Sequence, residues 1–449
     1  MPGSTRSFLP SALCLPPSDE SPYTPPVTEP TAAHIDHRPL AVLGWAAFLA
    51  CSWTWCIGMF LPVILLRDYG TWAWVVFALP NVVGAAAMGW VLQRQGASER
   101  MVGRHTPAMA AFSVVTILFH VLFVGWVVRW LGGVTGRGEW AFVWATVGAA
   151  VVCFPLLLAR RAALLLSGLV LAGSVAAFVL TVLNTPDRIP MAAGTATADL
   201  AYLAPVCLIG FACSPYLDLT FHRARQALTT YGGVAAFTLG FGAMFLVMIV
   251  FTLWYGPMTV PPGADRPGLP TQQITQAAAL AVVAHMAGQS GFTVAAHLVE
   301  LVRRHRRGVT TTKWGTIAGV LFGGGILGLV AYLLSRGDGE QGRFWGAGLG
   351  ANETGYRLFL SFYGLVAPAY VWVVVVPWRG SRTTDRQKWV TFVVTLLLAA
   401  PAYWVGFVEG KMVWLLAGVG VILLSRVLLE LAGGRTRGTT GDRTRNAAR

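Results

Sequence analysis

Twelve long apolar segments restrict this chain to a fold that lies in a lipid bilayer. Each segment is long enough to cross the hydrocarbon core, which takes about 20 residues of helix. Because water is absent there, the backbone must satisfy its own hydrogen bonds, and continuous apolar runs do so as helices. The predicted spans are 40–66, 71–93, 107–131, 139–159, 162–184, 198–221, 231–255, 274–301, 314–335, 355–377, 388–407 and 411–432.

The composition excludes soluble and disordered proteins. Hydrophobic residues make up 55% of the chain and charged residues 12%, whereas a soluble domain carries about 25% charged residues and a disordered chain has low hydrophobicity. The net charge of +14 would suit nucleic-acid binding, but the cations lie in short loops between apolar runs, where they orient membrane proteins. We therefore predict the lipid bilayer as a partner and no nucleic acid.

The loop charges also predict the orientation. If the N-terminus is cytoplasmic, most of the 33 Lys and Arg residues fall on the cytoplasmic side, as the positive-inside rule requires. We predict a multi-pass protein of the plasma membrane (the inner membrane of a bacterium) with both termini in the cytoplasm. The Pro-rich residues 1–39 and the basic residues 433–449 are predicted to be disordered arms around a transmembrane domain at 40–432.

A short string repeats in the first and sixth segments. Ala50-Cys51-Ser52 recurs as Ala212-Cys213-Ser214, 162 residues later. The second to fifth segments also pair in order with the seventh to tenth, at similar or larger offsets along the chain. Because the first and sixth segments run in opposite directions, this pattern predicts a 5+5 inverted repeat, the architecture of many secondary transporters. Repeat one would span 40–184 and repeat two 198–377, with two extra helices at 388–432.

Both strings are predicted sites of helix breaks. Residues 51–56 read Cys-Ser-Trp-Thr-Trp-Cys, and the second string is followed by Pro215, which removes a helix hydrogen bond. A simple proline kink is the alternative. Broken helices expose backbone groups that bind solutes and ions at mid-membrane. We therefore predict that the substrate lies between the breaks, against a set of polar and aromatic residues: Ser52, Trp53, Trp55, Cys213, Ser214 and Tyr216.

With these breaks the chain resembles the sodium/solute symporters of the amino acid–polyamine–organocation superfamily, which have the leucine-transporter fold. The resemblance rests on Thr54-Trp55, on Tyr69-Gly70 followed by Trp72 and Trp74, on residues 78–84 (Ala-Leu-Pro-Asn-Val-Val-Gly), and on the broken sixth segment ending in Arg223 and Arg225. It implies an all-α fold of about twelve helices, with broken first and sixth helices and two helices after the repeats.

The resemblance also implies a sodium site between carbonyls of helix one and hydroxyls of helix eight. The matching residues here are Ser290 and Thr293, with Cys51 and Thr54 on helix one. The two hydroxyls are three residues apart rather than adjacent, but residues at i and i+3 share a helix face. The acid that some members carry in helix five has no counterpart in 162–184. We expect bound Na⁺ and no organic cofactor.

Several polar residues inside the spans have two interpretations. Asp218 either couples an ion, the default for an intramembrane acid, or is an interfacial acid paired with His222 or Arg225. His120, His285 and Gln289 either line the substrate cavity, where a histidine could relay protons, or are hydrogen-bonded within the bundle. His297 and Glu300 lie nearer a basic loop and are predicted to be interfacial.

These observations predict a symporter that couples Na⁺ or H⁺ to a small neutral or zwitterionic solute by alternating access. One alternative is a receptor or scaffold that binds the solute without moving it. A second is an intramembrane enzyme, because Gly288-Gln289-Ser290-Gly291 looks like a serine-protease motif. That chemistry needs a histidine within hydrogen-bond reach of the serine, and the last four spans contain none. We therefore predict a protein that is not an enzyme.

Overall fold

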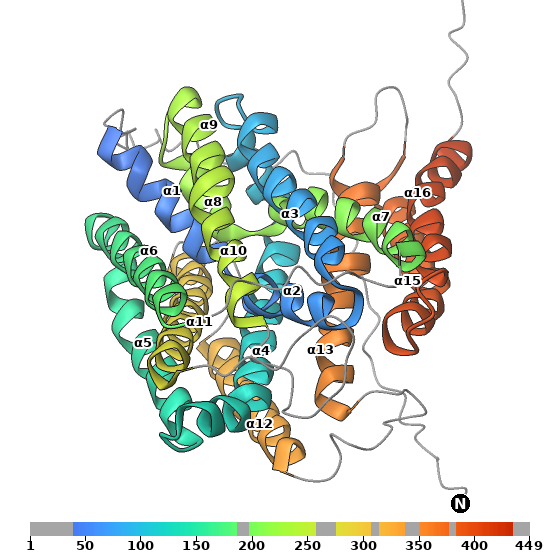
Figure 1. Ribbon diagram of the computed structural model, residues 1–449. Coiled ribbons are helices and arrows are strands. Elements are labelled where there is room, and N and C mark those ends of the chain that lie inside the picture. Colours follow the sequence, from blue (N-terminus) through green and yellow to red (C-terminus); the bar gives the residue numbers. More distant parts are fainter. Residues whose placement is uncertain are drawn as a thin grey trace, which may run out of the picture. The chain divides into compact units, whose positions relative to one another are not determined.

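The structure is a computed structural model, and it describes residues 39–185, 197–256, 275–306, 314–336, 350–376 and 383–433. Apart from Pro39 and Gly433, the two predicted disordered arms lie outside these residues. Sixteen α-helices and several tighter or wider helical turns make up the described part, in which no strand occurs (Figure 1).

The helices of the first predicted repeat are α1 (Pro39–Trp53), α2 (Cys56–Tyr69), α3 (Thr71–Val91), α4 (Ala97–Thr135), α5 (Trp140–Leu158) and α6 (Arg160–Leu183). Those of the second are α7 (Thr197–Cys213), the 3₁₀ turn η1 (Ser214–Leu217), α8 (Leu219–Gln226), α9 (Thr230–Leu239), η2 (Gly240–Phe245), α10 (Leu246–Tyr255), α11 (Gln276–Arg306), α12 (Trp314–Arg336), α13 (Ala351–Ser361), η5 (Phe362–Val366), α14 (Ala367–Tyr370) and η6 (Val371–Val375). The extra helices are α15 (Asp385–Tyr403), η7 (Trp404–Val408) and α16 (Trp414–Gly433).

The predicted spans agree with the helices. Ten helical stretches of the described chain are long and apolar enough to cross a membrane, and α1 with α2 forms an eleventh that is bent by 56°. The apolar part of α16, Trp414–Leu429, is a shorter helix at the position of the twelfth predicted span. The protein is thus an all-α, multi-pass integral membrane protein.

The packing of the helices follows the predicted repeat. Helix α4 (the third span) packs along α12 (the ninth span). Their counterparts in the other repeat are α11 (the eighth span) and α5 (the fourth span), and these two helices also pack along each other. The second span (α3) packs on the sixth (α7), and the seventh (α9 and η2) packs on the first (α1). If every span is replaced by its counterpart in the other repeat, each pair of packed helices therefore becomes another pair of packed helices, as an inverted repeat requires.

Small residues allow these helices to approach closely at equivalent positions. A Cβ at Gly240 of η2 would lie 2.8 Å from the Ala46 carbonyl of α1, and a Cβ at Gly84 of α3 would clash with the Phe211 carbonyl of α7. In the same way, a Cβ at Gly291 of α11 would lie 2.8 Å from the backbone nitrogen of Ala150 in α5. The crossing distances are thus set by backbone-to-backbone contact.

Wider turns interrupt several of the later helices. The π-helical segments η2, η5, η6 and η7 lie in the seventh, tenth and eleventh spans. Such π turns are rare and frequently lie at functional sites. The extra helices α15 and α16 pack together, and α16 also packs against α7, so they flank the second repeat.

We predict that Gly291→Ala destabilises the protein, because the new methyl group would lie 2.6 Å from Ala149 Cβ and would push α11 off α5. Overpacking of this kind costs about 1–3 kcal/mol. Gly288→Ala, on the same helix, is the matched control, because a Cβ there meets nothing within 4 Å. Thermal unfolding in detergent measures both. A Gly291→Ala protein that melts at or above the Gly288→Ala temperature would contradict this packing.

Candidate functional site

The first membrane-crossing segment breaks at Thr54 and Trp55. Helix α1 ends at Trp53, and α2 begins at Cys56 with its axis turned by 56°. Thr54 Oγ1 donates back to a carbonyl of α1 at 2.8 Å, and the Trp55 indole donates to the Ser52 carbonyl. Trp55 itself is extended, with φ −77° and ψ 174°. Local side chains thus occupy carbonyls that the interrupted helix leaves free, and the predicted break is confirmed.

Residues from other helices satisfy the new end of α2. The Cys56 amide donates to His120 Nε2 of α4 at 3.3 Å, and His120 Nδ1 lies 2.8 Å from the Thr116 carbonyl. Since a carbonyl only accepts, Nδ1 carries the proton and Nε2 is the acceptor. Tyr356 of α13 donates its hydroxyl to the Cys56 carbonyl at 2.9 Å. His120 therefore stabilises the break, with both ring nitrogens engaged.

The sixth segment breaks as well. Helix α7 ends at Cys213, a single 3₁₀ turn follows, and α8 starts at Leu219. Pro215 in this turn has no amide to continue the helix. Asp218 is extended (φ −82°, ψ 113°) and caps α8, because its carboxylate accepts the Thr220 amide at 2.7 Å. The acid thus takes the place that Asp commonly occupies at a helix N-terminus.

The two breaks meet through a chain of polar side chains. Thr220 Oγ1 lies 2.7 Å from Asp218 Oδ1 and 3.2 Å from Ser52 Oγ. Ser52 Oγ in turn lies 3.2 Å from the Leu49 carbonyl of α1. Ser52, Asp218 and Thr220 are all fully buried. The structure therefore brings the predicted residues Ser52 and Asp218 to one place, and adds Thr220, for which the sequence held no separate signal.

Asp218 lies inside the bundle, so the alternative of an interfacial acid paired with His222 or Arg225 is wrong. The His222 ring is taken by Ser98 Oγ at 2.8 Å and the Tyr216 carbonyl at 3.0 Å, and Arg225 binds carbonyls at the end of α3. Asp218 Oδ2 has no hydrogen-bond partner within the described chain. The break bends the segment so that residues after it stay within the protein.

Helix α11 completes this site. Thr293 Oγ1 donates to the Cys51 carbonyl of α1 at 3.4 Å. The Gln289 amide lies 2.8 Å from Ser174 Oγ of α6 and 3.7 Å from Cys51 Sγ. Ser290 Oγ is fully buried and has no partner among the described residues. The helix-one carbonyl and the helix-eight hydroxyl that the resemblance implies thus do meet at Cys51 and Thr293.

A small cavity of about 10 Å³, room for about one water molecule, lies between the breaks. Three of the predicted residues, Trp53, Trp55 and Ser214, line it, together with Asn81 and Tyr363. The Trp53 indole donates to Asn81 Oδ1 at 2.7 Å, and the rings of Trp53 and Trp55 are 4.3 Å apart. The cavity is therefore walled by aromatic faces with a few polar groups.

The sequence analysis missed Asn81 and Tyr363 as cavity residues. Tyr363 lies in the π turn η5, and its carbonyl accepts from Ser214 Oγ at 3.3 Å. A lone Asn or Tyr in an apolar run carries no signal of its own. Cys213 and Tyr216, which were predicted to line the substrate site, do not line this cavity.

The remaining predicted histidines lie apart from the cavity. The His285 ring packs against Phe251 and Tyr255 of α10, with centroids 5.0 and 6.3 Å apart. His297 is fully buried, 5.7 Å from the Trp55 ring, and Glu300 is 4% exposed. Both side chains are thus covered by protein near the end of α11, and their interfacial depth in the membrane stays a prediction.

The nucleophile–base pair of a serine protease is not formed. Ser290 Oγ makes no hydrogen bond to a histidine or to any other described residue, and His297 Nδ1 instead lies 3.1 Å from Ser113 Oγ of α4. The Gly-Gln-Ser-Gly motif acts in packing, since Gly291 is where α11 crosses α5.

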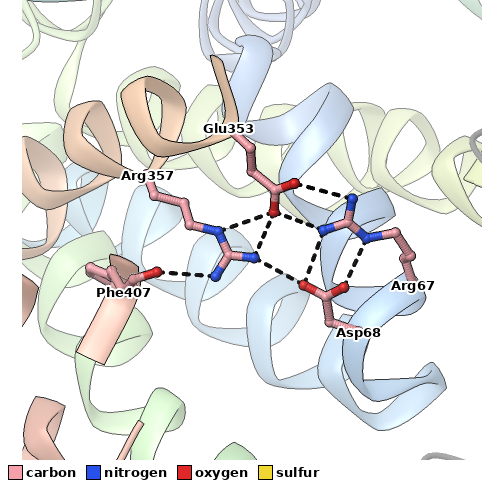
Figure 2. Close-up of polar contacts among 5 residues, drawn as sticks. All are labelled: Arg67, Asp68, Glu353, Arg357 and Phe407. Atoms are coloured by element: carbon pink, nitrogen blue, oxygen red, sulfur yellow. Dashed lines mark hydrogen bonds and ion pairs between the residues drawn. The ribbon is translucent and has the colours of Figure 1, made fainter. Parts of the chain in front are cut away.

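A cluster of four charged residues joins the end of α2 to the start of α13 (Figure 2). Arg67 lies 2.8 Å from Asp68 and 2.7 Å from Glu353, and Arg357 lies 2.7 Å from Glu353 and 3.0 Å from Asp68. Arg357 also donates to the Phe407 carbonyl of η7 at 3.1 Å, which links the cluster to the extra helices. The signal that was missed is Arg357 inside the tenth predicted span, with Arg67, Asp68 and Glu353 just outside the ends of predicted spans.

An apolar cavity lies directly beneath this cluster. Its volume is about 70 Å³, it is bounded by α2, α7, α13 and η7, and Asp68 and Arg357 are its charged lining residues. Its other walls are apolar and include Leu61, Cys207 and Phe211. Tyr363 and Phe211 line both this cavity and the smaller one between the breaks, so the two are adjacent.

A second group of charged residues, the Arg223–Glu300 pair, lies where α8 meets α11. Arg223 is 3.5 Å from Glu300 and donates to the Leu157 carbonyl at 2.8 Å. Its guanidinium also stands over the rings of Trp45 and Phe48, at 5.7 and 5.3 Å. The pair is buried, with 7% and 6% of the side chains exposed. Arg223 and Glu300 thus tie α8 to α11, and Arg223 also contacts α1 and α5.

We predict that Arg357→Gln opens the cavity beneath the four-charge cluster. Breaking a largely buried pair costs about 3–5 kcal/mol, and 1.4 kcal/mol is already tenfold in an equilibrium. The reaction rate of Cys207 with a membrane-impermeant thiol reagent should therefore rise at least tenfold.

Lys411→Gln is the matched control for that change, because the Lys411–Glu409 pair is largely exposed, with 64% and 34% of the side chains accessible. Exposed pairs contribute little, so the Cys207 rate should stay within twofold. Equal rates in the wild type and in Arg357→Gln would show that the cluster does not close the cavity.

No protein-family model and no curated protein matches the sequence. Two solved structures are similar to it along most of its length. One is a Na⁺-coupled sialic acid symporter in a substrate-bound outward-open state, with 14% identity and a TM-score of 0.49 over 87% of this chain and 89% of that one. The other is MhsT in complex with L-phenylalanine, with 14% identity and a TM-score of 0.38 over 86% of this chain and 98% of that one.

At such low identities and TM-scores these matches carry no argument about the chain, and its fold rests on its own structural features. Its two broken helices meet at one polar site, and its helix pairs exchange as an inverted repeat requires. The chain is therefore a multi-pass membrane protein of all-α class with broken first and sixth helices and two extra helices.

Proposed function

We propose that the protein is a cation-coupled secondary transporter of a small organic solute. The observation that carries this proposal is the contact between the two breaks, from Ser52 of α1 through Thr220 to Asp218. Broken helices near mid-membrane, with unpaired polar groups between them, are typical of transport sites. A buried intramembrane carboxylate by default indicates an ion or substrate path.

The cation would bind between α1, α8 and α11. The Cys51 carbonyl and the hydroxyls of Ser290 and Thr293 supply neutral oxygen donors, and unwound helix carbonyls are the groups that coordinate Na⁺ in such folds. Thr54 stands at the same break. Asp218 supplies a negative charge that reaches Ser52 of α1 through two hydrogen bonds, both made by Thr220. These donors favour Na⁺ at this site.

The solute would bind in the cavity between the breaks, next to the cation. Trp53, Trp55 and Tyr363 offer aromatic faces that stack on apolar parts of a solute or attract an ammonium group. Ser214 and Asn81 offer polar contacts. No charged residue lines this cavity, which favours a neutral or zwitterionic molecule. Cys213, Tyr216 and His120 would flank this solute rather than contact it first.

Alternating access would use the two groups of charged residues as closures in turn. With the predicted orientation, the four-charge cluster faces the outside and the Arg223–Glu300 pair faces the cytoplasm. Opening one while the other stays closed would expose the site to one side at a time. Both are paired here, as in an occluded state.

We predict that sodium raises the melting temperature of the purified protein in a saturable way, relative to potassium or choline at equal ionic strength. A ligand that binds only the folded state adds about 2.7 kcal/mol at a hundredfold excess over Kd. Thr293→Val removes one oxygen donor and keeps the shape, so the sodium-dependent rise should fall by more than half.

Thr395→Val is the matched control. Thr395 is 2% exposed and donates only within α15, to the Thr391 carbonyl, so this variant should keep the full sodium effect. Identical melting in all three cations would overturn the sodium site. Saturable solute binding without solute counterflow in proteoliposomes would favour a receptor that does not transport.

A further inference from the structure

Buried polar atoms without partners are concentrated on one helix. Within the described chain, five such atoms lie on α11 between His285 and His297, whereas α1, α13 and the Asp218 turn carry one each. The five atoms are Nδ1 and Nε2 of His285, Oε1 of Gln289, Oγ of Ser290 and Nε2 of His297. A buried polar atom without a hydrogen bond costs free energy, so this concentration calls for an explanation.

The residues concerned lie along one face of α11. His285, Gln289, Thr293 and His297 follow one another at intervals of four residues, and Glu300 continues the row. With a rise of about 1.5 Å per residue, the row extends roughly 22 Å, most of a hydrocarbon core of about 30 Å. Each of these side chains is at most 4% exposed. We call this row the α11 polar row.

The other buried histidines provide a contrast. His120 and His222 are 1% and 0% exposed, like those of the row, yet both nitrogens of each have partners within the protein. Burial alone therefore does not leave a histidine unpaired in this fold. The unpaired nitrogens are specific to the row.

We propose that the α11 polar row is a hydrated path along which protons move through the bundle. This inference deepens the proposed function and rests on it, because it adds a proton-linked step to a cation-coupled transporter. Polar residues within a membrane are costly and commonly mark proton relays. A neutral imidazole donates from one ring nitrogen and accepts at the other, so it can pass a proton between waters on its two sides.

The order of groups along the row suits such a relay. His285 has both ring nitrogens available, and Gln289 Oε1 and Ser290 Oγ are acceptors that can order water between the histidines. His297 has Nε2 available while its Nδ1 is held by Ser113. Beyond it, Glu300 faces Arg223 at the end of the row.

Several other titratable or charged groups lie on the elements packed against α11. Helix α6 contributes serines, Ser167 and Ser174, and no charged side chain within its apolar length. On helices α1, α4, α5 and α10 the titratable groups are Cys51, His120, Cys153 and Tyr255, respectively. On α8 they are the N-cap residue Asp218 and the helix residues His222 and Arg223. Of these, Tyr255 and His120 have their polar atoms engaged with backbone groups. The two histidines are therefore the natural relay groups of the row.

The test is histidine hydrogen–deuterium exchange of the full-length protein in lipid nanodiscs, read by mass spectrometry across pH. Exchange at the ring Cε1 position requires that the imidazole reach water and take up a proton. His285 and His297 should exchange at least tenfold faster than His120 and His222, which are equally buried but fully hydrogen-bonded and so serve as internal controls. Rates for His285 and His297 as slow as those of the controls would overturn the proposal.

A variant provides an independent check. Gln289→Leu keeps the approximate size of the side chain and removes the acceptor between the histidines, so exchange at His285 or His297 should slow at least threefold. Ser425→Ala is a control, since Ser425 is 3% exposed and lies on α16, away from the row. Unchanged rates in Gln289→Leu would exclude water ordered along the row.

Failure of this inference and failure of the proposed function can be told apart. Exchange is measured without any solute, and the sodium-dependent melting and solute counterflow do not report on the histidines. Slow exchange with an intact sodium response would leave a sodium-coupled transporter without a proton path. Fast exchange with no sodium response would make protons the coupling ion.

Discussion

A helix that stops within a bilayer leaves backbone groups that lipid cannot satisfy, and much of this structure answers that constraint. Each unsatisfied group costs several kcal/mol in hydrocarbon. At the first break the Cys56 amide that starts α2 donates to His120, and the Ser52 carbonyl at the end of α1 accepts from the Trp55 indole. At the second break Asp218 caps α8. The helices that surround the breaks are therefore required for the breaks to exist, and the close glycine crossings bring them near enough.

After the backbone groups at the breaks have found partners, a few buried polar side-chain atoms of the described residues remain without hydrogen bonds. These atoms define what the site can bind. Within the described chain Asp218 Oδ2 and Ser290 Oγ stay unpaired, and the Cys51 carbonyl accepts from Thr293 of the same helix as Ser290. Two ion-pair groups lie elsewhere in the bundle, the buried Arg223–Glu300 pair and the partly buried four-charge cluster, and the cluster also reaches the extra helices through the Phe407 carbonyl. In the proposed function these two groups close the site toward the two sides of the membrane.

The spans and the two breaks could be predicted from the sequence because their causes are local. Long apolar runs must be helices in lipid, and Pro215 and the Cys-Ser-Trp-Thr-Trp-Cys stretch are unfavourable in a helix interior, although Pro62 and Pro80 lie inside continuous helices. Depth in the bundle has no local cause, which is why Asp218 was open to an interfacial interpretation. The four-charge cluster escaped notice because Arg67 and Glu353 are 286 residues apart, and only the tertiary fold unites them.

The central claim is that the broken helices form one site that opens alternately to the two sides. Distances between paired spin labels in nanodiscs test this directly. One pair, at Trp72 and Arg137, reports on the end near the four-charge cluster, and the other, at Leu40 and Gly315, on the opposite end; all four positions are exposed. Adding sodium in place of choline should lengthen the first distance and shorten the second. Distances that stay fixed, or that change in the same direction, would contradict alternating access.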